Sequence, residues 1–127
     1  MNNSKDIGKN GETITLNYLL NKNYFFIEKN YHSRYGEIDI IVENEKYIVF
    51  VEVKTRNDKY ISRGEESVER KKREKIIKTA FEYILKNGTD KQPRFDISEI
   101  IVDSRNKFKS INYFENAFDL EEYSEIF

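Results

Sequence analysis

The hydrophobic and polar positions along the chain predict an alternation of helices and strands. Apolar residues at three- and four-residue spacing predict an amphipathic helix over residues 7–22. Ser62 followed by Glu65 resembles a capping box and predicts a second, longer helix that ends near Lys86. Segments rich in β-branched and aromatic residues predict strands at 24–29, 36–43, 46–55, 95–103 and 108–114.

The order of these segments, α-β-β-β-α-β-β, indicates an α/β fold in which helices flank a single mixed sheet. The turn-like residues 43–46 predict that the second and third strands form a hairpin. A chain of 127 residues has room for one domain with one core. We expect that domain to span residues 1–118, and residues 119–127 to form an acidic tail or a short helix.

The composition is that of a folded globular protein and excludes several kinds of site. The chain is 38% hydrophobic and 35% charged, and its nine Tyr and nine Phe argue against disorder. The absence of cysteine excludes disulfides and thiolate chemistry, and the single histidine, His32, excludes a site that needs two imidazoles. The sequence contains neither an apolar stretch long enough to span a membrane nor the apolar core of a signal peptide, so we expect a cytoplasmic protein.

Charge is unevenly distributed along the chain. The net charge of −1 argues weakly against a polyanionic partner. Residues 54–78, however, contain ten basic and five acidic side chains, whereas residues 115–127 contain five acidic and no basic ones. Such segregation is compatible with a positive face on a neutral protein. On charge alone, a solvated helix face and an acidic tail are the better interpretation.

The strand at 46–55 has charged residues where a buried strand would be apolar. Its side chains alternate, so that one face is wholly apolar. The other face begins with Ile48 and Phe50 but continues with Glu52 and Lys54. Charged side chains are rarely buried unless they are paired, because desolvation of a lone charge costs several kcal/mol.

The strand at 36–43 shows the same anomaly. Alternation predicts that Asp39 shares one face with Glu37, while the opposite face is formed by Ile38, Ile40 and Val42. Pairing of the two strands as a hairpin would place Asp39 beside Glu52. Both carboxylates would then point to the same side of the sheet.

Three interpretations of these charges remain open from the residues alone. Glu52 or Asp39 could form a structural ion pair with Lys54, or the charges could protect a sheet edge from aggregation. Alternatively, the two carboxylates could hold a divalent cation, since they repel each other unless a proton or a metal separates them. In the last case, the ammonium of Lys54 could orient a water molecule or stabilise charge on a phosphate.

The same residues resemble a known group of enzymes. Asp39, followed by Glu52-Val53-Lys54 on the next strand, resembles the core of the PD-(D/E)XK nuclease superfamily, with Ile38 in place of the Pro of its name. A wider series resembles the bacterial YraN-like family of predicted endonucleases, which is distantly similar to archaeal Holliday-junction resolvases. The series consists of Gly11-Glu12, Asn30, Arg34, Gly36–Asp39, Val49–Lys54, Val68, Lys72, Arg94–Asp96 and Asn116–Phe118.

This resemblance implies a restriction-endonuclease-like fold and a DNA endonuclease that uses Mg²⁺ or Mn²⁺. Its substrates would include branched DNA, and the two cuts needed to resolve a junction would favour a homodimer. By the resemblance, Asp39 and Glu52 are metal ligands, with the backbone carbonyl of Val53 as a third. Lys54 is the catalytic lysine, and Glu12 faces the same site as a further ligand or a water-holding group.

The remaining candidates concern the surroundings of that site. The expected DNA contacts are Arg34, Arg56, Arg63 and Lys72, although Arg56 and Arg63 could equally belong to a solvated loop, and Lys72 could extend past the helix to solvent. Glu37 is either an acid behind the metal ligands or an ion-pair partner of Arg34 or Lys54. Two rival functions stay open: a non-catalytic nucleic-acid-binding module, and an adaptor that binds a protein through an exposed strand or the acidic tail.

Overall fold

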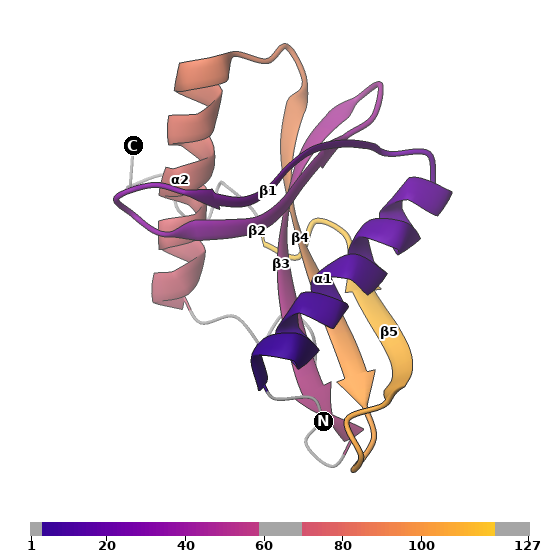
Figure 1. Cartoon of the computed structure of the whole chain (residues 1–127). Helices are drawn as coiled ribbons and strands as arrows, with labels where there is room; N and C mark the ends of the chain where they lie inside the picture. Colours follow the sequence, from indigo (N-terminus) through magenta and orange to yellow (C-terminus); the bar gives the residue numbers. More distant parts are fainter. Residues whose placement is uncertain (1–3, 59–69, 119–127) are drawn as a thin grey trace.

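The computed structural model describes residues 4–58 and 70–118, and side chains from residue 10 onward. Two helices and five strands follow one another in the predicted order (Figure 1). They are α1 (Ser4–Asn21), β1 (Phe25–His32), β2 (Glu37–Glu43), β3 (Tyr47–Asn57), α2 (Arg70–Asn87), β4 (Gln92–Val102) and β5 (Phe108–Phe114). The predicted fold class is confirmed, and the architecture is consistent with a restriction-endonuclease-like fold.

The five strands form one mixed sheet in the order β1-β2-β3-β4-β5. Neighbouring strands are antiparallel except for β3 and β4, which are parallel along their full length. Parallel neighbours require a crossover connection, and α2 lies in that connection. The hairpin predicted between β2 and β3 is present, and its turn is closed by Asn44, whose Oδ1 accepts hydrogen bonds from the N–H groups of Lys46 and Tyr47.

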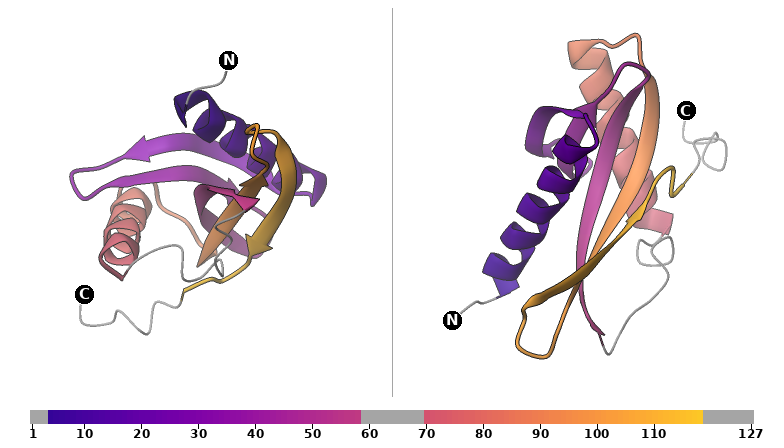
Figure 2. Two further views of the ribbon diagram at one scale, coloured as in Figure 1. Left: turned by 90° about the horizontal axis from the view of Figure 1, so that it is seen from below. Right: turned by 90° about the vertical axis from the view of Figure 1, so that its right-hand side faces the viewer.

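The two helices cover opposite faces of the sheet (Figure 2). Under α1, Leu19 packs in a cluster with Val49 and Val51 of β3. Under α2, Ile77 packs in a second cluster with Phe50. The predicted alternation of β3 is therefore confirmed. Both faces of this strand are covered, which explains its continuous apolar run.

The predicted alternation of β2 is wrong at one point. Ile38 belongs to the cluster under α2 together with Ile41, whereas Ile40 belongs to the cluster under α1. The ladder between β2 and β3 reaches only as far as Ile40, which pairs with Val51. Beyond that pair β2 leaves the ladder at Asp39, and the two-residue period is broken there.

The boundaries of several elements differ from the prediction. β1 extends to His32 because its pairing with β2 continues to Glu37. β4 begins at Gln92, where its pairing with β3 starts. α2 ends at Asn87 as predicted, followed by Gly88 with a φ of 76°. The predicted capping box, Val68, Arg63 and the segment 119–127 lie outside the described residues.

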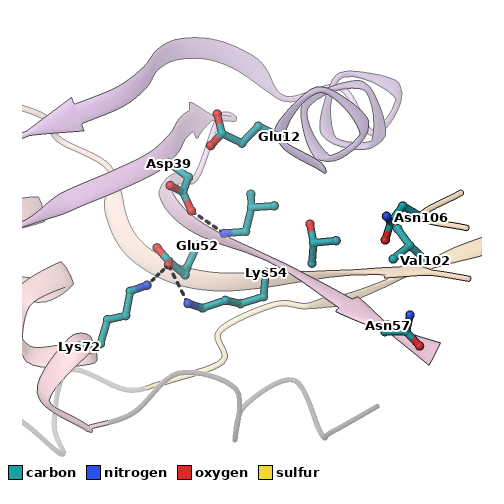
Figure 3. Close-up of a pocket in the computed structure, with 10 residues that line it drawn as sticks. Glu12, Asp39, Glu52, Lys54, Asn57, Lys72, Val102 and Asn106 are labelled. Atoms are coloured by element: carbon teal, nitrogen blue, oxygen red, sulfur yellow. Dashed lines mark hydrogen bonds and ion pairs between the residues drawn. The ribbon is translucent and has the colours of Figure 1, made fainter. Parts of the chain in front are cut away.

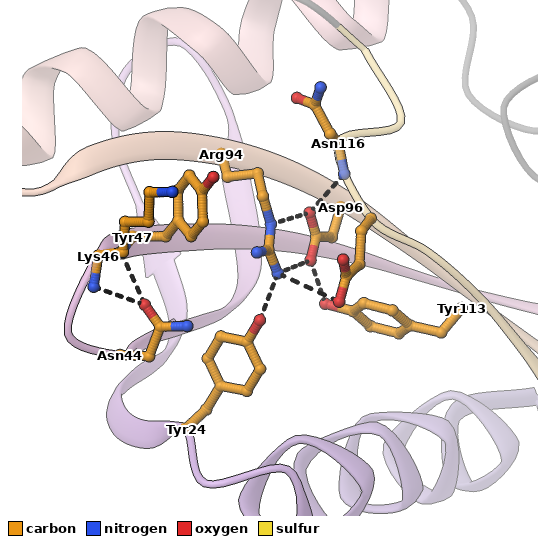
Figure 4. Close-up of polar contacts among 9 residues, drawn as sticks. Tyr24, Asn44, Lys46, Tyr47, Arg94, Asp96, Tyr113 and Asn116 are labelled. Carbon is orange, nitrogen blue, oxygen red and sulfur yellow. Dashed lines mark hydrogen bonds and ion pairs between the residues drawn. The ribbon is translucent and has the colours of Figure 1, made fainter.

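A buried polar network lies under α1 (Figure 4). Arg94 donates two hydrogen bonds to the carboxylate of Asp96, at 2.9 and 2.8 Å, and forms a buried ion pair with it. Arg94 also donates to the hydroxyl of Tyr24, while Asp96 accepts from the Tyr113 hydroxyl and from the N–H of Asn116. Asp96 is completely buried, so this network satisfies a charge that would otherwise be costly.

Of the helices that the structure describes, neither is long and apolar enough to cross a membrane.

Candidate functional site

Charged side chains in the middle of β3 meet a lysine of α2 in a cluster of charges (Figure 3). Glu52 and Lys54 follow Phe50 on the face covered by α2, and Glu52 is 5% exposed. The Nζ atom of Lys72 lies 2.7 Å from Glu52 Oε1, and the Nζ atom of Lys54 lies 3.6 Å from the same oxygen. Glu52 therefore faces two ammonium groups, one from its own strand and one from the helix.

Asp39 lies beside Glu52, just beyond the point where the ladder between β2 and β3 ends. Its Oδ2 accepts a hydrogen bond of 2.8 Å from the N–H of Val53, in place of a backbone carbonyl. Burial and the neighbouring carboxylate of Glu52 raise the pKa of Asp39 to about 8, although the bond from Val53 opposes this shift. A carboxyl with such a pKa holds a proton at neutral pH, and a cation that binds there would have to replace that proton.

The end of the ladder with β2 also leaves one edge of β3 without a paired strand. From Glu52 onward β3 is paired with β4, while its ladder with β2 has ended. The N–H and C=O of one strand residue point to the same edge. Because the N–H of Val53 points to Asp39, the carbonyl of Val53 faces the same side, which is the position that the sequence resemblance assigned to a third ligand.

The pKa values of the two lysines shift in opposite directions. Burial and the neighbouring Lys72 lower the pKa of Lys54. Burial, the largest single effect, disfavours the charged form of Lys72, but its hydrogen bonds to Glu52 and Lys54 and the negative charges of Glu52 and Asp39 together outweigh it and raise its pKa. Lys72 is thus firmly protonated, whereas Lys54 is the ammonium that loses its proton more readily.

Glu12 approaches the site from α1. Burial raises the pKa of its carboxyl, although Lys29 opposes this effect. With its amide nitrogen turned toward the carboxylates, Asn30 donates to Glu12 Oε1 at 3.3 Å and to Glu37 Oε1 at 3.2 Å. Asn30 has a φ of 54°, and its two hydrogen bonds link the helix to the start of β2.

Two cavities adjoin these charges. The larger, of about 460 Å³, is lined by Glu12, Asp39, Glu52, Val53, Lys54, Thr55, Asn57, Lys72, Val102 and Asn106 (Figure 3). The smaller, of about 130 Å³, is lined by Gly36, Glu37, Asp39, Glu52, Lys72, Lys75 and Ile76. The structure therefore brings the predicted residues Glu12, Asp39, Glu52, Val53, Lys54 and Lys72 together around one cavity.

Other predicted residues lie elsewhere. Arg34 is exposed and rests on the ring of Tyr35, 4.9 Å from its centroid, while also donating to the Tyr35 hydroxyl. Arg56 is partly buried on β3. Glu37 is exposed and lies 3.7 Å from His32 Nδ1, and it lines only the smaller of the two cavities.

Three polar residues of the larger cavity were not predicted from the sequence: Thr55, Asn57 and Asn106. Thr55 and Asn57 follow Val53 at two-residue spacing and therefore lie on the same face of β3. Extension of that face beyond Val53 would have identified them from the sequence. Asn106 lies between β4 and β5, and no sequence pattern connects it with β3.

The chemistry of the donor set indicates which metal could be held. In the part of the chain that the structure describes, no group of three or more His, Cys, Asp or Glu side chains is arranged to hold a metal by itself. Asp39 and Glu52 supply two carboxylates. Mg²⁺ is usually bound by one or two carboxylates and keeps several waters, whereas structural zinc sites use four protein ligands. The residues fit a hydrated, oxygen-bound cation.

Comparison with known proteins places the chain in a family. Residues 11–100 match the model of the family described as "Uncharacterised protein family UPF0102". The chain belongs to this family. The UPF0102 match is the family that the YraN-like resemblance indicated, and the matched segment includes Glu12, Asp39, Glu52 and Lys54.

Individual UPF0102 proteins are similar over nearly their whole length. The UPF0102 protein of Clostridioides difficile (strain 630) is 45% identical over 117 residues, which is 91% of this chain and 99% of that protein. A UPF0102 protein of Clostridium botulinum (strain Kyoto / Type A2) is 40% identical over 119 residues, which is 92% of this chain and 97% of that protein. These two relatives therefore match this chain along nearly the whole length of both proteins.

Proposed function

We propose that this UPF0102 protein is a metal-dependent DNA endonuclease of the PD-(D/E)XK type. One observation carries the proposal. Asp39 and Glu52 lie side by side at one cavity, where the ladder between β2 and β3 ends, and Lys54 lies two residues beyond Glu52 at the same cavity. This arrangement has the order and the spatial grouping of the nuclease core that the sequence resembles. Branched DNA is the first substrate to test, and a homodimer would suit a reaction with two cuts.

The electrostatics favour a cation site in addition to the ion pairs that Glu52 forms with Lys54 and Lys72. An ion pair needs one carboxylate and one ammonium. Here Asp39 and Glu52 are brought together, although burial and mutual repulsion raise the pKa of Asp39 to about 8. Such an arrangement lowers the stability of the protein at neutral pH unless a cation binds, and it is typical of functional sites.

Asp39 and Glu52 would hold Mg²⁺ or Mn²⁺, with the carbonyl of Val53 as a further ligand. When bound, such a cation lowers the pKa of a coordinated water and withdraws charge from a phosphate oxygen. The N–H of Val53 fixes the orientation of Asp39. Glu12, from the opposite side of the cavity, is placed to accept a hydrogen bond from a water in it.

Lys54 would act on the reacting phosphate. Its Nζ atom lies 3.6 Å from Glu52, at the wall of the same cavity. From there the amine can donate a hydrogen bond to the attacking water or to a phosphate oxygen that gains charge. Burial and the neighbouring Lys72 lower the pKa of Lys54, which makes the proton on this atom easier to transfer.

The test is cleavage of labelled four-way-junction, duplex and single-stranded DNA with Mg²⁺, Mn²⁺ or EDTA. We expect cleavage that requires the cation and that falls by about 100-fold or more in Asp39→Asn, Glu52→Gln and Lys54→Ala. Glu45→Gln and Lys71→Ala are matched controls, because both residues are exposed and neither lines the two cavities. The preferred substrate decides whether the enzyme is specific for junctions.

Two outcomes would contradict the proposal. Equal cleavage by the wild type and by folded variants of Asp39, Glu52 and Lys54 would remove these residues from the chemistry. DNA binding without cleavage, unaffected by the cation, would instead support a non-catalytic nucleic-acid-binding module. Circular dichroism of each variant shows whether the fold is retained.

A further inference from the structure

Lys72 is the one lysine of α2 that reaches the carboxylates, among the residues that the structure describes. Its side chain is 45% exposed, whereas the Glu52 side chain that it contacts is 6% exposed. A half-exposed lysine on a flexible stem can leave such a contact far more easily than the buried carboxylate can. The mobile partner of this ion pair is therefore Lys72.

The contact of Lys72 lies where a divalent cation would bind. Its Nζ atom is 2.7 Å from Glu52 Oε1, and Glu52 in turn faces Asp39. A cation held by these carboxylates would bring two positive charges close to the ammonium. The repulsion, together with competition for the same carboxylate, weakens the ion pair between Lys72 and Glu52.

The surroundings offer Lys72 another ligand. Lys72 lines both cavities, the larger one with Lys54 and the smaller one with Lys75. An ammonium released from Glu52 would remain at the wall of the larger cavity. The ligand that suits the two ammonium groups of Lys54 and Lys72 at the wall of this cavity is a polyanion, and in the proposed function this is the phosphate backbone of DNA.

We propose that Lys72 is a phosphate contact controlled by the metal: Glu52 holds it while the carboxylates lack a divalent cation, and it binds a DNA phosphate once the cation is present. This inference rests on the proposed function and adds a coupling between two binding events. Because such coupling is reciprocal, the cation raises the affinity for DNA by the same factor as DNA raises the affinity for the cation.

The first experiment measures cation binding without DNA. Calorimetric titration with Mn²⁺ compares the wild type, Lys72→Met and the matched control Lys75→Met, which removes the same charge one turn further along α2. We expect Lys72→Met to bind Mn²⁺ about three- to tenfold more tightly than the control, the range for a half-exposed, charge-assisted ion pair. Equal affinity in the two variants, or no Mn²⁺ binding at all, would overturn the inference.

The second experiment measures DNA binding without cleavage, by fluorescence anisotropy in a Lys54→Ala background. Mn²⁺ should raise the affinity for a labelled duplex over that in EDTA. We expect this gain to persist with Lys75→Met and to disappear with Lys72→Met. If the gain survives Lys72→Met, Lys72 is not the metal-controlled contact.

A third variant tests the same coupling without any metal. Glu52→Gln removes the charge that holds Lys72, so DNA binding in EDTA should become tighter, and the effect should vanish in Glu52→Gln combined with Lys72→Met. An equal gain with and without Lys72 would contradict the inference. Because none of these measurements uses cleavage, the proposed nuclease could fail its own test while the coupling is observed, and the reverse is equally distinguishable.

Discussion

At the scale of single residues, Asp39 connects the architecture with the chemistry. Its Oδ2 accepts a hydrogen bond from the N–H of Val53, a backbone group that has no ladder partner on β2 because the ladder between β2 and β3 ends at Ile40. The same carboxyl faces Glu52. The Asp39 side chain therefore accepts the hydrogen bond of an unpaired N–H at the edge of β3, and it also provides one of the two carboxylates of the proposed cation site.

The raised pKa of Asp39 predicts how the metal-free protein responds to pH. The pKa is about 8 in the fold and 3.8 ordinarily, so between these values the native state keeps a proton that the unfolded chain has lost. The free energy of unfolding in EDTA should therefore fall as the pH rises from 5 to 8, by at most about 1.4 kcal/mol per pH unit.

Urea unfolding in EDTA at several pH values checks this prediction. Asp39→Asn cannot titrate, so its stability should depend less steeply on pH than that of the wild type. Glu45→Gln, in the exposed turn between β2 and β3, should retain the wild-type dependence. Parallel curves for the wild type and Asp39→Asn would show that Asp39 is ionised in the fold.

The residues of the site were predictable to different degrees. Asp39 and Glu52 could be paired from sequence because both are charges in apolar strands and the hairpin sets their register. Lys72 could be placed on the inner side of its helix by its spacing from Ile76. Its contact with Glu52 could not be predicted, because a long flexible side chain has several possible partners.

At the scale of elements, the close approach of α1 to the sheet depends on Gly11. A Cβ atom at this position would lie 2.9 Å from Thr55 Oγ1 and 3.4 Å from side-chain carbons of Val53 and Ile100. Glycine normally weakens a helix interior. Here it lets the helix lie against the end of β3, where the neighbouring Glu12 reaches the cavity.

Gly11→Ala is therefore expected to destabilise the protein, although alanine favours the helix. The crowding against Thr55 should lower the free energy of unfolding by about 1–3 kcal/mol, more than the gain of about 1 kcal/mol in helix propensity. Asn17→Ala, at an exposed position of α1, should be neutral or slightly stabilising. Urea unfolding of the two variants compares them, and a stable Gly11→Ala protein would show that α1 can move away at little cost.

The elements also show where sequence patterns stop being informative. The alternation of side chains along β3 was predicted correctly, because both faces of this strand are covered throughout its apolar part. The face to which Ile38 of β2 belongs was predicted wrongly. Alternation assumes a continuous ladder, and the ladder between β2 and β3 ends at Ile40. The bend that creates the site is the feature that periodicity could not predict.

At the scale of the whole molecule, the proposed cation should act on stability as well as on chemistry. The two carboxylates come from different strands of the central hairpin, so a ligand that binds both favours the folded state. Mn²⁺ at 100 times its dissociation constant should raise the free energy of unfolding by about 2.7 kcal/mol. The melting temperature should rise accordingly, and Glu52→Gln should lose most of the increase.

Thermal unfolding with Mn²⁺ or EDTA measures this effect. Glu45→Gln serves as the control, because it removes an exposed carboxylate from the same hairpin. Should the wild type and Glu52→Gln gain equally from Mn²⁺, the cation binds elsewhere on the molecule.

The order of elements and the class of fold could be predicted for the whole molecule, because hydrophobic periodicity and turn residues are local. The position of α1 and α2 on opposite faces and the strand order of the sheet are global. They follow from packing between segments that are distant in sequence, such as β3 and β4, which pair across α2. Local patterns contain little of that information.

The buried Arg94–Asp96 network has a consequence for the order of assembly during synthesis. Asp96 depends on Tyr113 and Asn116, and the N–H of Ala117 is bonded to the carbonyl of Phe95. A nascent chain that has reached only the end of β4 has none of these partners for a carboxylate at the centre of the sheet. Until β5 and the segment after it leave the ribosome, Arg94 is the hydrogen-bond donor that Asp96 retains, so the network is completed late, and a translational stop before Asn116 removes the last hydrogen bond to this buried carboxylate.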